Sequence, residues 1–318
     1  MTLTMNPAVD LATCVDKVMP IDKMRCTTPR FDPGGGGINV ARTAAGLGVE
    51  VTAVFPSGGL HGRLLEQLVR EAGVPVRSVS VAEPTRENVA VTDTATGEQY
   101  RFVFRGPRIT APEQHRCLAE VERAVRGVRY LVASGTLPPG ASPDFYQTLT
   151  DLVAESGVRV VLDTSGPALR TMRHGVYLIK PSVRELGDYV GHPLTERAEQ
   201  LSAARTLITS GMTEIVLLSL GAAGALVVTR NQHEWFPPIP ARVRSGIGAG
   251  DAMVGGTTVG LVRGYSLADA VRLGIAAATA ALATVGTGPG RPEHIDELYR
   301  ELVRIEAAAG ADKDRTPG

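Results

Sequence analysis

The 318-residue sequence has little cysteine, and its cysteines form no recognisable metal-binding or disulfide pattern. Cys14, Cys26 and Cys117 are far apart and odd in number, and no CxxC pair occurs. This spacing argues against a disulfide framework and against a zinc site. It is typical of a protein kept in a reducing compartment, so we predict that the protein is cytoplasmic.

The sequence also lacks the signals of membrane and nucleic-acid binding. It contains no uncharged apolar stretch of about 18 residues, the length needed to span a bilayer. Its first residues, MTLTMNPAVD, have no basic region followed by an apolar run, so we expect no signal peptide. Basic and acidic residues both number 33, which excludes the basic excess typical of nucleic-acid binders.

Lysine is scarce. It occurs only four times among the 33 basic residues, which leaves 29 arginines. A lysine retained in such a sequence is more often one whose compact ammonium group does something that a guanidinium group cannot. Lys23 and Lys180 are the two that lie in motifs described below.

What the sequence does contain is an alternation of strand-like and helix-like segments. Runs rich in β-branched residues occur at 51–55, 76–81, 130–133, 158–162, 176–179 and 214–219. Segments with a 3.6-residue apolar period lie between them, at 60–72, 112–125, 143–155 and 195–210. The alternation predicts βαβ units and a mainly parallel sheet with helices on both faces.

Two regions interrupt this alternation. Residues 10–33 contain short strand-like pieces and prolines, and residues 84–104 contain a predicted hairpin with its turn at 95–97. We predict that both regions are antiparallel and form a small β-lid, inserted into a single α/β domain that covers residues 1–307. Helices are predicted at 250–263, 266–285 and 291–307, followed by a disordered tail at 308–318.

A run of small residues, SGIGAGD at 245–251, precedes an apolar helix. Small residues let the backbone approach a ligand closely, and the unpaired first amides of a helix attract anions. Asp251 is then placed to accept a proton from an attacking hydroxyl, while the amides of Gly248, Ala249 and Gly250 hold a phosphoryl group. By itself, the segment fits a tight turn with a helix-capping carboxylate equally well.

A second glycine-rich run, at 34–37, leads into a helix that contains Asn39. Four successive glycines are costly in chain entropy, but they are reasonable where backbone amides contact a ligand. The Asn39 amide is able to bind a sugar hydroxyl as donor and as acceptor. No Walker A or GxGxxG pattern is present, and the alternative interpretation is a flexible loop.

Two further segments follow predicted strands, whose carboxyl ends are where doubly wound folds bind ligands. In KPSVRE at 180–185, Glu185 is of the type that holds Mg²⁺ directly or through water. SLGAAGA at 219–225 is suited to cradling a nucleotide phosphate. The alternatives are an exposed glutamate in a first helical turn and an ordinary hairpin turn.

Cations occur in both parts of the predicted lid, with Lys23 and Arg25 in one part and Arg86 in the other. Beside a glycine-rich anion site they suggest a substrate or nucleotide that carries phosphate groups, although each alone is typical of a solvated surface charge. The six histidines show no HxxxH or HExxH spacing, and no GxSxG elbow occurs.

In their order and spacing, these segments resemble the PfkB branch of the ribokinase superfamily across nearly the whole chain. The resemblance is carried by NPAVD at 6–10, GGGGINVAR at 34–42, SGTLPPG at 134–140, LDTSG at 162–166, and the 180–185, 219–225 and 245–251 segments. KMRC at 23–26, TREN at 85–88 and GEQYRFV at 97–103 resemble the minor 6-phosphofructokinase subgroup specifically.

This resemblance implies a ribokinase-like three-layer α/β/α sandwich with a small inserted β-lid. It also implies an ATP-dependent sugar kinase of glycolysis that converts fructose 6-phosphate to fructose 1,6-bisphosphate. Relatives that act on fructose 1-phosphate or tagatose 6-phosphate usually carry lysine within the glycine run. The run here contains glycine only, which favours fructose 6-phosphate.

Roles for individual residues follow from the same resemblance. Asp251 would be the catalytic base, with Gly248, Ala249 and Gly250 as the anion hole. The sugar and its phosphate would contact Asp10, Gly35, Gly36, Asn39, Thr136 and Arg86. ATP would contact Lys180, Ser182, Ser219, Gly221, Gly224, Val243, Ile275 and Thr279, and Lys23 would reach between both substrates. Glu185 would organise Mg²⁺, and a K⁺ loop would use Ser245, Ile247, Ala281, Thr284, Gly286 and Gly288.

Two positions depart from the family pattern. Ser182 replaces the Asn of an Asn-x-x-Glu motif, which predicts weaker organisation of Mg²⁺, and Gly246 replaces a Thr, which predicts a looser K⁺ loop. The alternatives are therefore a 1-phosphofructokinase or tagatose-6-phosphate kinase, and a sugar- or nucleotide-binding protein without turnover. Family analogy also implies a homodimer formed through the lid.

Overall fold

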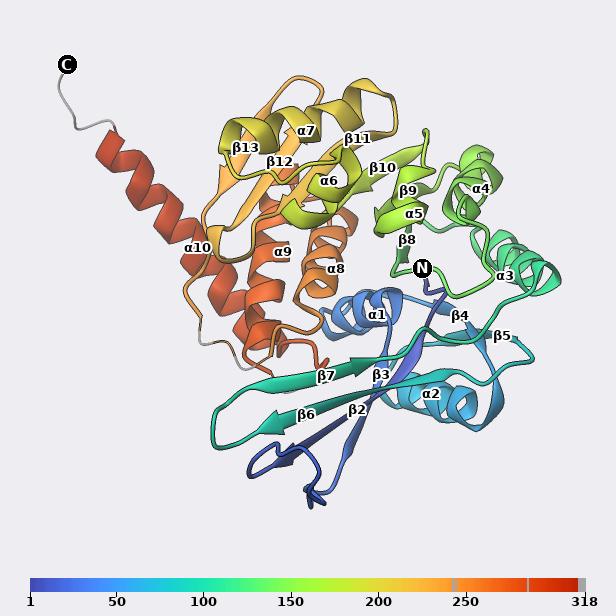
Figure 1. The fold of residues 1–318 in the computed structure, drawn as a ribbon. Helices are drawn as coiled ribbons and strands as arrows, with labels where there is room; N and C mark the ends of the chain where they lie inside the picture. Colours follow the sequence, from blue (N-terminus) through green and yellow to red (C-terminus); the bar gives the residue numbers. More distant parts are fainter. Residues whose placement is uncertain (242, 244, 285, 314–318) are drawn as a thin grey trace.

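The computed structural model describes residues 1–241, 243, 245–284 and 286–313, of which 306–313 are described by their backbone alone. A nine-stranded sheet forms its centre (Figure 1), in the order β13-β12-β11-β10-β9-β8-β1-β4-β5. Neighbouring strands are parallel except in the β11–β12 and β12–β13 pairs, which are antiparallel. The strands are β1 (Thr2–Leu3), β4 (Ala53–Ser57), β5 (Val76–Ser80), β8 (Tyr130–Ser134), β9 (Arg159–Asp163), β10 (Val176–Ile179), β11 (Thr213–Ser219), β12 (Ala225–Thr229) and β13 (His233–Phe236).

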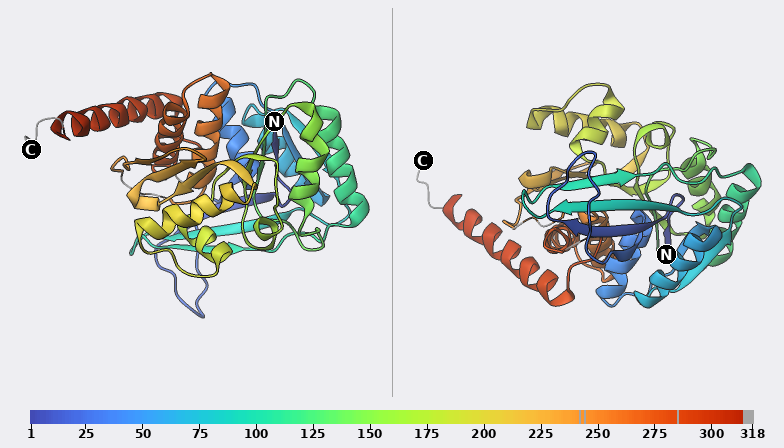
Figure 2. Two further views of the ribbon diagram at one scale, coloured as in Figure 1. Left: turned by 90° about the horizontal axis from the view of Figure 1, so that it is seen from above. Right: turned by 60° about the horizontal axis from the view of Figure 1, so that its bottom comes forward.

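Helices cover both faces of this sheet, which confirms the predicted α/β class (Figure 2). One face carries α3 (Ala111–Ala124), α4 (Phe145–Val153), α5 (Gly166–Arg170), α6 (Val183–Val190) and α7 (Arg197–Thr209). The other carries α1 (Gly36–Gly46), α2 (Gly59–Glu71), α8 (Ala249–Val262), α9 (Leu267–Leu282) and α10 (Pro292–Lys313).

Alternate residues of the central strands enter different cores. Leu131 and Ala133 of β8 pack on the α3–α7 side, whereas Val132 packs against the helices of the opposite face. A strand buried on both faces has no polar side to show, so its sequence is a nearly continuous apolar run. This is why the strand-like runs were visible in the sequence.

The two regions that interrupt the alternation form a separate four-stranded sheet. Its order is β3-β2-β6-β7, with strands β2 (Ala8–Val15), β3 (Arg30–Gly34), β6 (Arg86–Asp93) and β7 (Gln99–Val103). The β2–β3 and β6–β7 pairs are antiparallel as predicted, but β2 and β6 are parallel. The predicted hairpin turn is present, because Asp93 Oδ1 accepts bonds from the N–H groups of Ala95 and Thr96.

The C-terminal helix is longer than the sequence predicted. α10 continues past residue 307 to Lys313, so the prediction of a disordered tail is wrong for residues 308–313. The alanines at 307–309 are strong helix formers and extend the preceding amphipathic pattern. Residues 314–318 lie outside the described part of the chain. Within that part, no helix is both long and apolar enough to cross a membrane.

Candidate active site

The glycine-rich run at 34–37 is closely packed, which rules out the flexible-loop alternative. Gly35 has φ +114°, a conformation that L side chains rarely adopt. A Cβ atom on Gly36 would lie 2.2 Å from Ser134 Oγ, and one on Gly37 would lie 2.6 Å from the Leu3 carbonyl oxygen. The glycines therefore let the start of α1 rest directly on the carboxyl ends of β1 and β8.

The start of α8 lies beside this contact. Gly248 takes a left-handed conformation with φ +78°, and Ala249, Gly250 and Asp251 make the first turn. The first amides of a helix have no partner within the helix and point outward. This segment therefore has the geometry that an anion-binding turn requires.

Asp251 does not cap its own helix. Its Oδ2 accepts a hydrogen bond of 2.9 Å from Asn39 Nδ2 on α1, and Ser134 at the end of β8 also bonds to it. Burial raises the pKa of Asp251 above its ordinary value, and the bonds from Asn39 and Ser134 act against that rise. The carboxylate is thus held between α1, α8 and β8, in an environment that favours taking up a proton.

Lys180 brings a positive charge to the same place. It is 4% exposed, and its Nζ lies 3.2 Å from Asp163 Oδ1 at the end of β9. Burial raises the pKa of Asp163 to about 6. Burial also opposes the charge of Lys180, but the nearby carboxylates of Asp163, Glu185 and Asp251 together outweigh it and raise the pKa of Lys180. A Cβ atom on Gly250 would be 3.6 Å from Lys180 Nζ, so the ammonium group faces the first turn of α8.

Ser182 and Glu185 form a capping box at the start of α6. Glu185 Oε2 accepts bonds of 2.8 Å from both the N–H and the hydroxyl of Ser182. No cluster of three acidic, His or Cys side chains suited to a metal occurs among residues 1–305 that the structure describes. A site with one carboxylate fits Mg²⁺, which keeps several waters and binds through substrate phosphates.

Ser219 lies next to this box at the end of β11. Its N–H donates to the Pro181 carbonyl oxygen at 3.0 Å, and residues 182 and 219 form an isolated bridge. The 219–225 segment, with Gly221 and Gly224, connects the antiparallel strands β11 and β12. The hairpin alternative therefore describes its geometry, and a phosphate role for it stays a prediction.

The predicted K⁺ loop consists of two segments beside α8. The Ser245 N–H donates to the Leu282 carbonyl oxygen at 3.2 Å, and the Thr284 hydroxyl lies 2.8 Å from the Gly288 carbonyl oxygen. A Cβ atom on Gly248 would be 4.0 Å from the Thr287 carbonyl oxygen. These segments offer carbonyl and hydroxyl oxygens without a carboxylate, a donor set that suits K⁺. Ile247, Ala281 and Gly286 lie in the same two segments.

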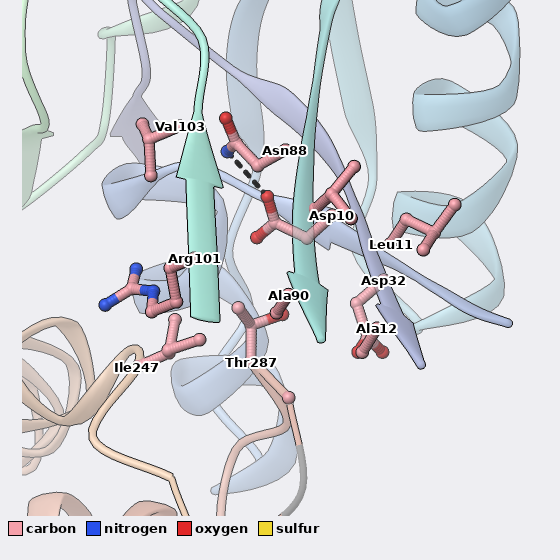
Figure 3. Close-up of a pocket in the computed structure, with 12 residues that line it drawn as sticks. Asp10, Leu11, Ala12, Asp32, Asn88, Ala90, Arg101, Val103, Ile247 and Thr287 are labelled. Atoms are coloured by element: carbon pink, nitrogen blue, oxygen red, sulfur yellow. Dashed lines mark hydrogen bonds between the residues drawn. The ribbon is translucent and has the colours of Figure 1, made fainter. Parts of the chain in front are cut away.

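The face of the four-stranded sheet that carries Asp10 and Arg101 forms one wall of a pocket (Figure 3). Ile247 and Thr287 line the pocket from the other side. Asp10 accepts a bond of 2.8 Å from Asn88 there, and burial raises the pKa of Asp10. Arg101 lines the same pocket. Polar side chains of the predicted lid therefore face the loops that contain Ile247 and Thr287, next to α8.

A neighbouring pocket contains Arg86 and Thr136. The two terminal nitrogens of Arg86 donate to the carbonyl oxygens of Asn6 and Phe104, where the predicted lid joins the main domain. The structure therefore gives Arg86 a structural role in addition to the phosphate contact that was predicted.

Some predicted site residues are not brought together. Lys23 is exposed in the connection between β2 and β3, and in the described part of the chain it has no contact with Asp251 or Lys180. Val243 is 63% exposed, whereas Ile275 and Thr279 are buried in α9. The roles assigned to these four residues stay predictions.

Three residues at the site had no predicted role, namely Ser134, Asp163 and Arg101. Ser134 and Asp163 are the last residues of β8 and β9. The rule that ligands meet the carboxyl ends of parallel strands would have found both. Arg101 lies two residues before Val103 on β7, and both line the pocket, so strand periodicity would have found it.

Comparison with known proteins agrees with this geometry. A family model described as pfkB family carbohydrate kinase matches residues 3–294. ATP-dependent 6-phosphofructokinase isozyme 2 of Mycobacterium tuberculosis is 48% identical over 312 residues, which cover 98% of this chain and 92% of the relative. A 1-phosphofructokinase of Xanthomonas campestris is 33% identical over 266 residues, 82% of this chain and 83% of the relative.

Solved structures agree as well. Phosphofructokinase-2 from Escherichia coli in complex with potassium has a TM-score of 0.90 at 38% identity, covering 95% of this chain and 98% of that chain. The tetrameric inhibited form of the same protein has a TM-score of 0.89 at the same identity and coverage. The family model covers most of the chain, and these relatives cover nearly all of it. This chain belongs to the pfkB family of carbohydrate kinases.

Proposed function

We propose that the protein is an ATP-dependent 6-phosphofructokinase, which converts fructose 6-phosphate to fructose 1,6-bisphosphate in glycolysis. The observation that carries this proposal is the position of Asp251 at the start of α8, held by Asn39 beside the first-turn amides and Lys180. Transfer of a phosphoryl group to a hydroxyl needs a base and a preorganised anion site at one place. The choice of fructose 6-phosphate as the acceptor rests on the relatives named 6-phosphofructokinase.

In the proposed reaction, Asp251 takes the proton of the sugar hydroxyl as its oxygen attacks the γ-phosphorus of ATP. The bond from that phosphorus to the β–γ bridging oxygen breaks, and ADP leaves with the electron pair. The amides of Gly248, Ala249 and Gly250, together with Lys180, stabilise the charge on the transferred group. Mg²⁺, held by Glu185 with ATP phosphates and water, would supply further neutralising charge.

The other positions take the roles implied by the family. The sugar would be bound by Asp10, Gly35, Gly36, Asn39 and Thr136, and its phosphate by Arg86. Ser182, Ser219, Gly221 and Gly224 would contact ATP phosphates and ribose, Val243, Ile275 and Thr279 would contact the adenine, and Lys23 would reach between the substrates. K⁺ would bind the 245–247 and 281–288 segments, whose oxygen donors suit it.

The acceptor is tested by measuring ADP release from MgATP with fructose 6-phosphate, fructose 1-phosphate and tagatose 6-phosphate, with and without K⁺. We expect the highest kcat/KM with fructose 6-phosphate. A preference for fructose 1-phosphate or tagatose 6-phosphate would establish the alternative acceptor. No release above background with any sugar would establish a binding protein without turnover.

We further propose a homodimer formed through the four-stranded sheet. Leu11 pairs with Phe31 and with Val89, and Val89 pairs with Phe102, so one apolar row crosses all four strands. The row lies on the face opposite the Asp10 pocket, because strand residues alternate between faces. Phe31 is 38% and Phe102 54% exposed in one chain, which favours burial against a second copy.

We place the reaction in the cytoplasm. Cys14, Cys26 and Cys117 are all free thiols in the structure. Unpaired thiols are the normal state of cysteine in a reducing compartment. The proposed substrates, ATP and a phosphosugar, are charged small molecules, and the balanced charge of the chain suggests no nucleic-acid partner.

A further inference from the structure

Arg42 carries a buried guanidinium group next to the candidate active site. The residue is 9% exposed and lies on α1, one turn after Asn39. Its Nη1 faces four oxygens, namely the Thr287 carbonyl at 2.9 Å, the Pro33 carbonyl at 3.2 Å, the Thr287 hydroxyl at 3.3 Å and Asn39 Oδ1 at 3.4 Å. Burying a charge is costly unless it is paired and hydrogen-bonded, and Arg42 Nη2 also lies 3.9 Å from Asp32 Oδ1. The buried guanidinium group is therefore held from several sides.

Two of the residues that Arg42 contacts, Asn39 and Thr287, also lie beside Gly248. A Cβ atom on Gly248 would be 3.8 Å from Asn39 Nδ2 and 4.0 Å from the Thr287 carbonyl oxygen. Gly248 is the turn residue from which the first amides of α8 follow. A single guanidinium group therefore contacts two of the residues that lie beside the start of the anion site.

Arg42 also determines which way the Asn39 amide points. Asn39 Nδ2 donates to Asp251 Oδ2 at 2.9 Å, while Asn39 Oδ1 faces Arg42. The reversed amide would place oxygen against the Asp251 carboxylate and NH₂ against the guanidinium group, and both contacts are unfavourable. Because Arg42 donates on one side of the Asn39 amide and Asp251 accepts on the other, only one orientation of the amide is stable.

We propose that Arg42 is a positioning residue for phosphoryl transfer, because it holds Asn39 and Thr287 around Gly248 and so fixes Asp251 against the anion site. This inference rests on the proposed kinase function. The hydrogen bonds of Arg42 go to protein oxygens, so we infer that it acts through Asn39 and Thr287.

The test compares Arg42→Met with Arg263→Met. Arg263 donates from Nη2 to the Leu47 carbonyl oxygen at 2.6 Å and joins the far ends of the same two helices, α1 and α8. We expect R42M to lower kcat by about 10- to 100-fold, the usual effect of misplacing a reacting group by about an ångström, and to leave the KM for ATP within about twofold. R263M should lower the melting temperature and keep the wild-type kcat.

A double-mutant cycle with Asn39→Ala separates positioning from simple stabilisation. If Arg42 acts largely through Asn39, the R42M change should lower kcat much less in the N39A background than in the wild type. Independent, multiplicative effects would overturn the inference, as would a wild-type kcat in folded R42M. If R42M does not fold, Arg42→Lys, which keeps the charge without the planar fork, takes its place in the cycle. Absence of turnover in the wild type with every phosphosugar would overturn the proposed function, and this inference with it.

Discussion

Gly250→Ala separates the stability of α8 from its proposed use as an anion site. Gly250 is an exposed residue in the first turn of the helix. A Cβ atom there would meet only Lys180, at 3.6 Å from Nζ and 3.9 Å from Cε, which is ordinary van der Waals contact. The folded chain therefore accepts the methyl group. Alanine favours a helix over glycine by about 0.5–1 kcal/mol, so G250A should be slightly more stable than the wild type.

Activity should change in the opposite direction. A phosphoryl oxygen bonded to both the Gly250 amide and Lys180 Nζ would lie about 2.7–3.1 Å from each nitrogen. The added methyl group occupies that space, since it sits 3.6 Å from Nζ. Loss of one preorganised donor at an anion hole lowers kcat by about 10²- to 10³-fold, and we expect an effect of that size.

The assay measures kcat by coupled ADP release and the melting temperature by calorimetry. Gly46→Ala is the matched control, because Gly46 is also an exposed helical glycine and a Cβ atom there would meet nothing within 4 Å. G46A should gain similar stability and keep its kcat. A wild-type kcat in G250A would refute the assignment of the α8 start as the phosphoryl site.

Three further predictions concern the acceptor, the base and the assembly. Arg86→Ala should raise the KM for fructose 6-phosphate by about 10-fold or more, as expected for a lost charged hydrogen bond, while the KM for ATP changes little. Equal effects on both KM values would contradict the proposed contact of Arg86 with the sugar phosphate. Asn39→Ala removes a hydrogen bond that lowers the pKa of Asp251, so the pKa should rise and the acid limb of the kcat–pH profile should shift to higher pH. An acid limb at the wild-type pH would contradict this. Phe102→Asp, on the exposed apolar row, should give a monomer by light scattering, and an unchanged mass would count against the proposed dimer contact.

The sequence predicted the fold class well for a physical reason. Strands buried on both faces, such as β8 and β9, are apolar through their centres, and their boundaries were predicted to within one residue. The parallel pairing of β2 with β6 was not predicted, because it joins segments that are distant in the chain. The extent of α10 was also missed, since polar composition was taken for disorder where helix propensity is high.

The candidate site was predicted in part. Asp251, Asn39 and Lys180 lie in recognisable glycine- or proline-containing segments, and the structure brings them to one edge of the sheet. Ser134 and Asp163 were missed because the rule that ligands meet the carboxyl ends of parallel strands was not applied to β8 and β9. The rule gives their position, but their partners, Asp251 for Ser134 and Lys180 for Asp163, are known only from the folded chain.

The central claim is that Asp251 is the base of a phosphoryl transfer to fructose 6-phosphate. The most direct test follows formation of fructose 1,6-bisphosphate from MgATP and fructose 6-phosphate by ³¹P NMR, for the wild type and for Asp251→Asn at equal concentrations of folded protein. We predict rapid formation by the wild type and a rate lower by about 10²- to 10⁴-fold in the variant, the usual contribution of a general base. Equal rates in the two proteins, or no bisphosphate from the wild type, would contradict it.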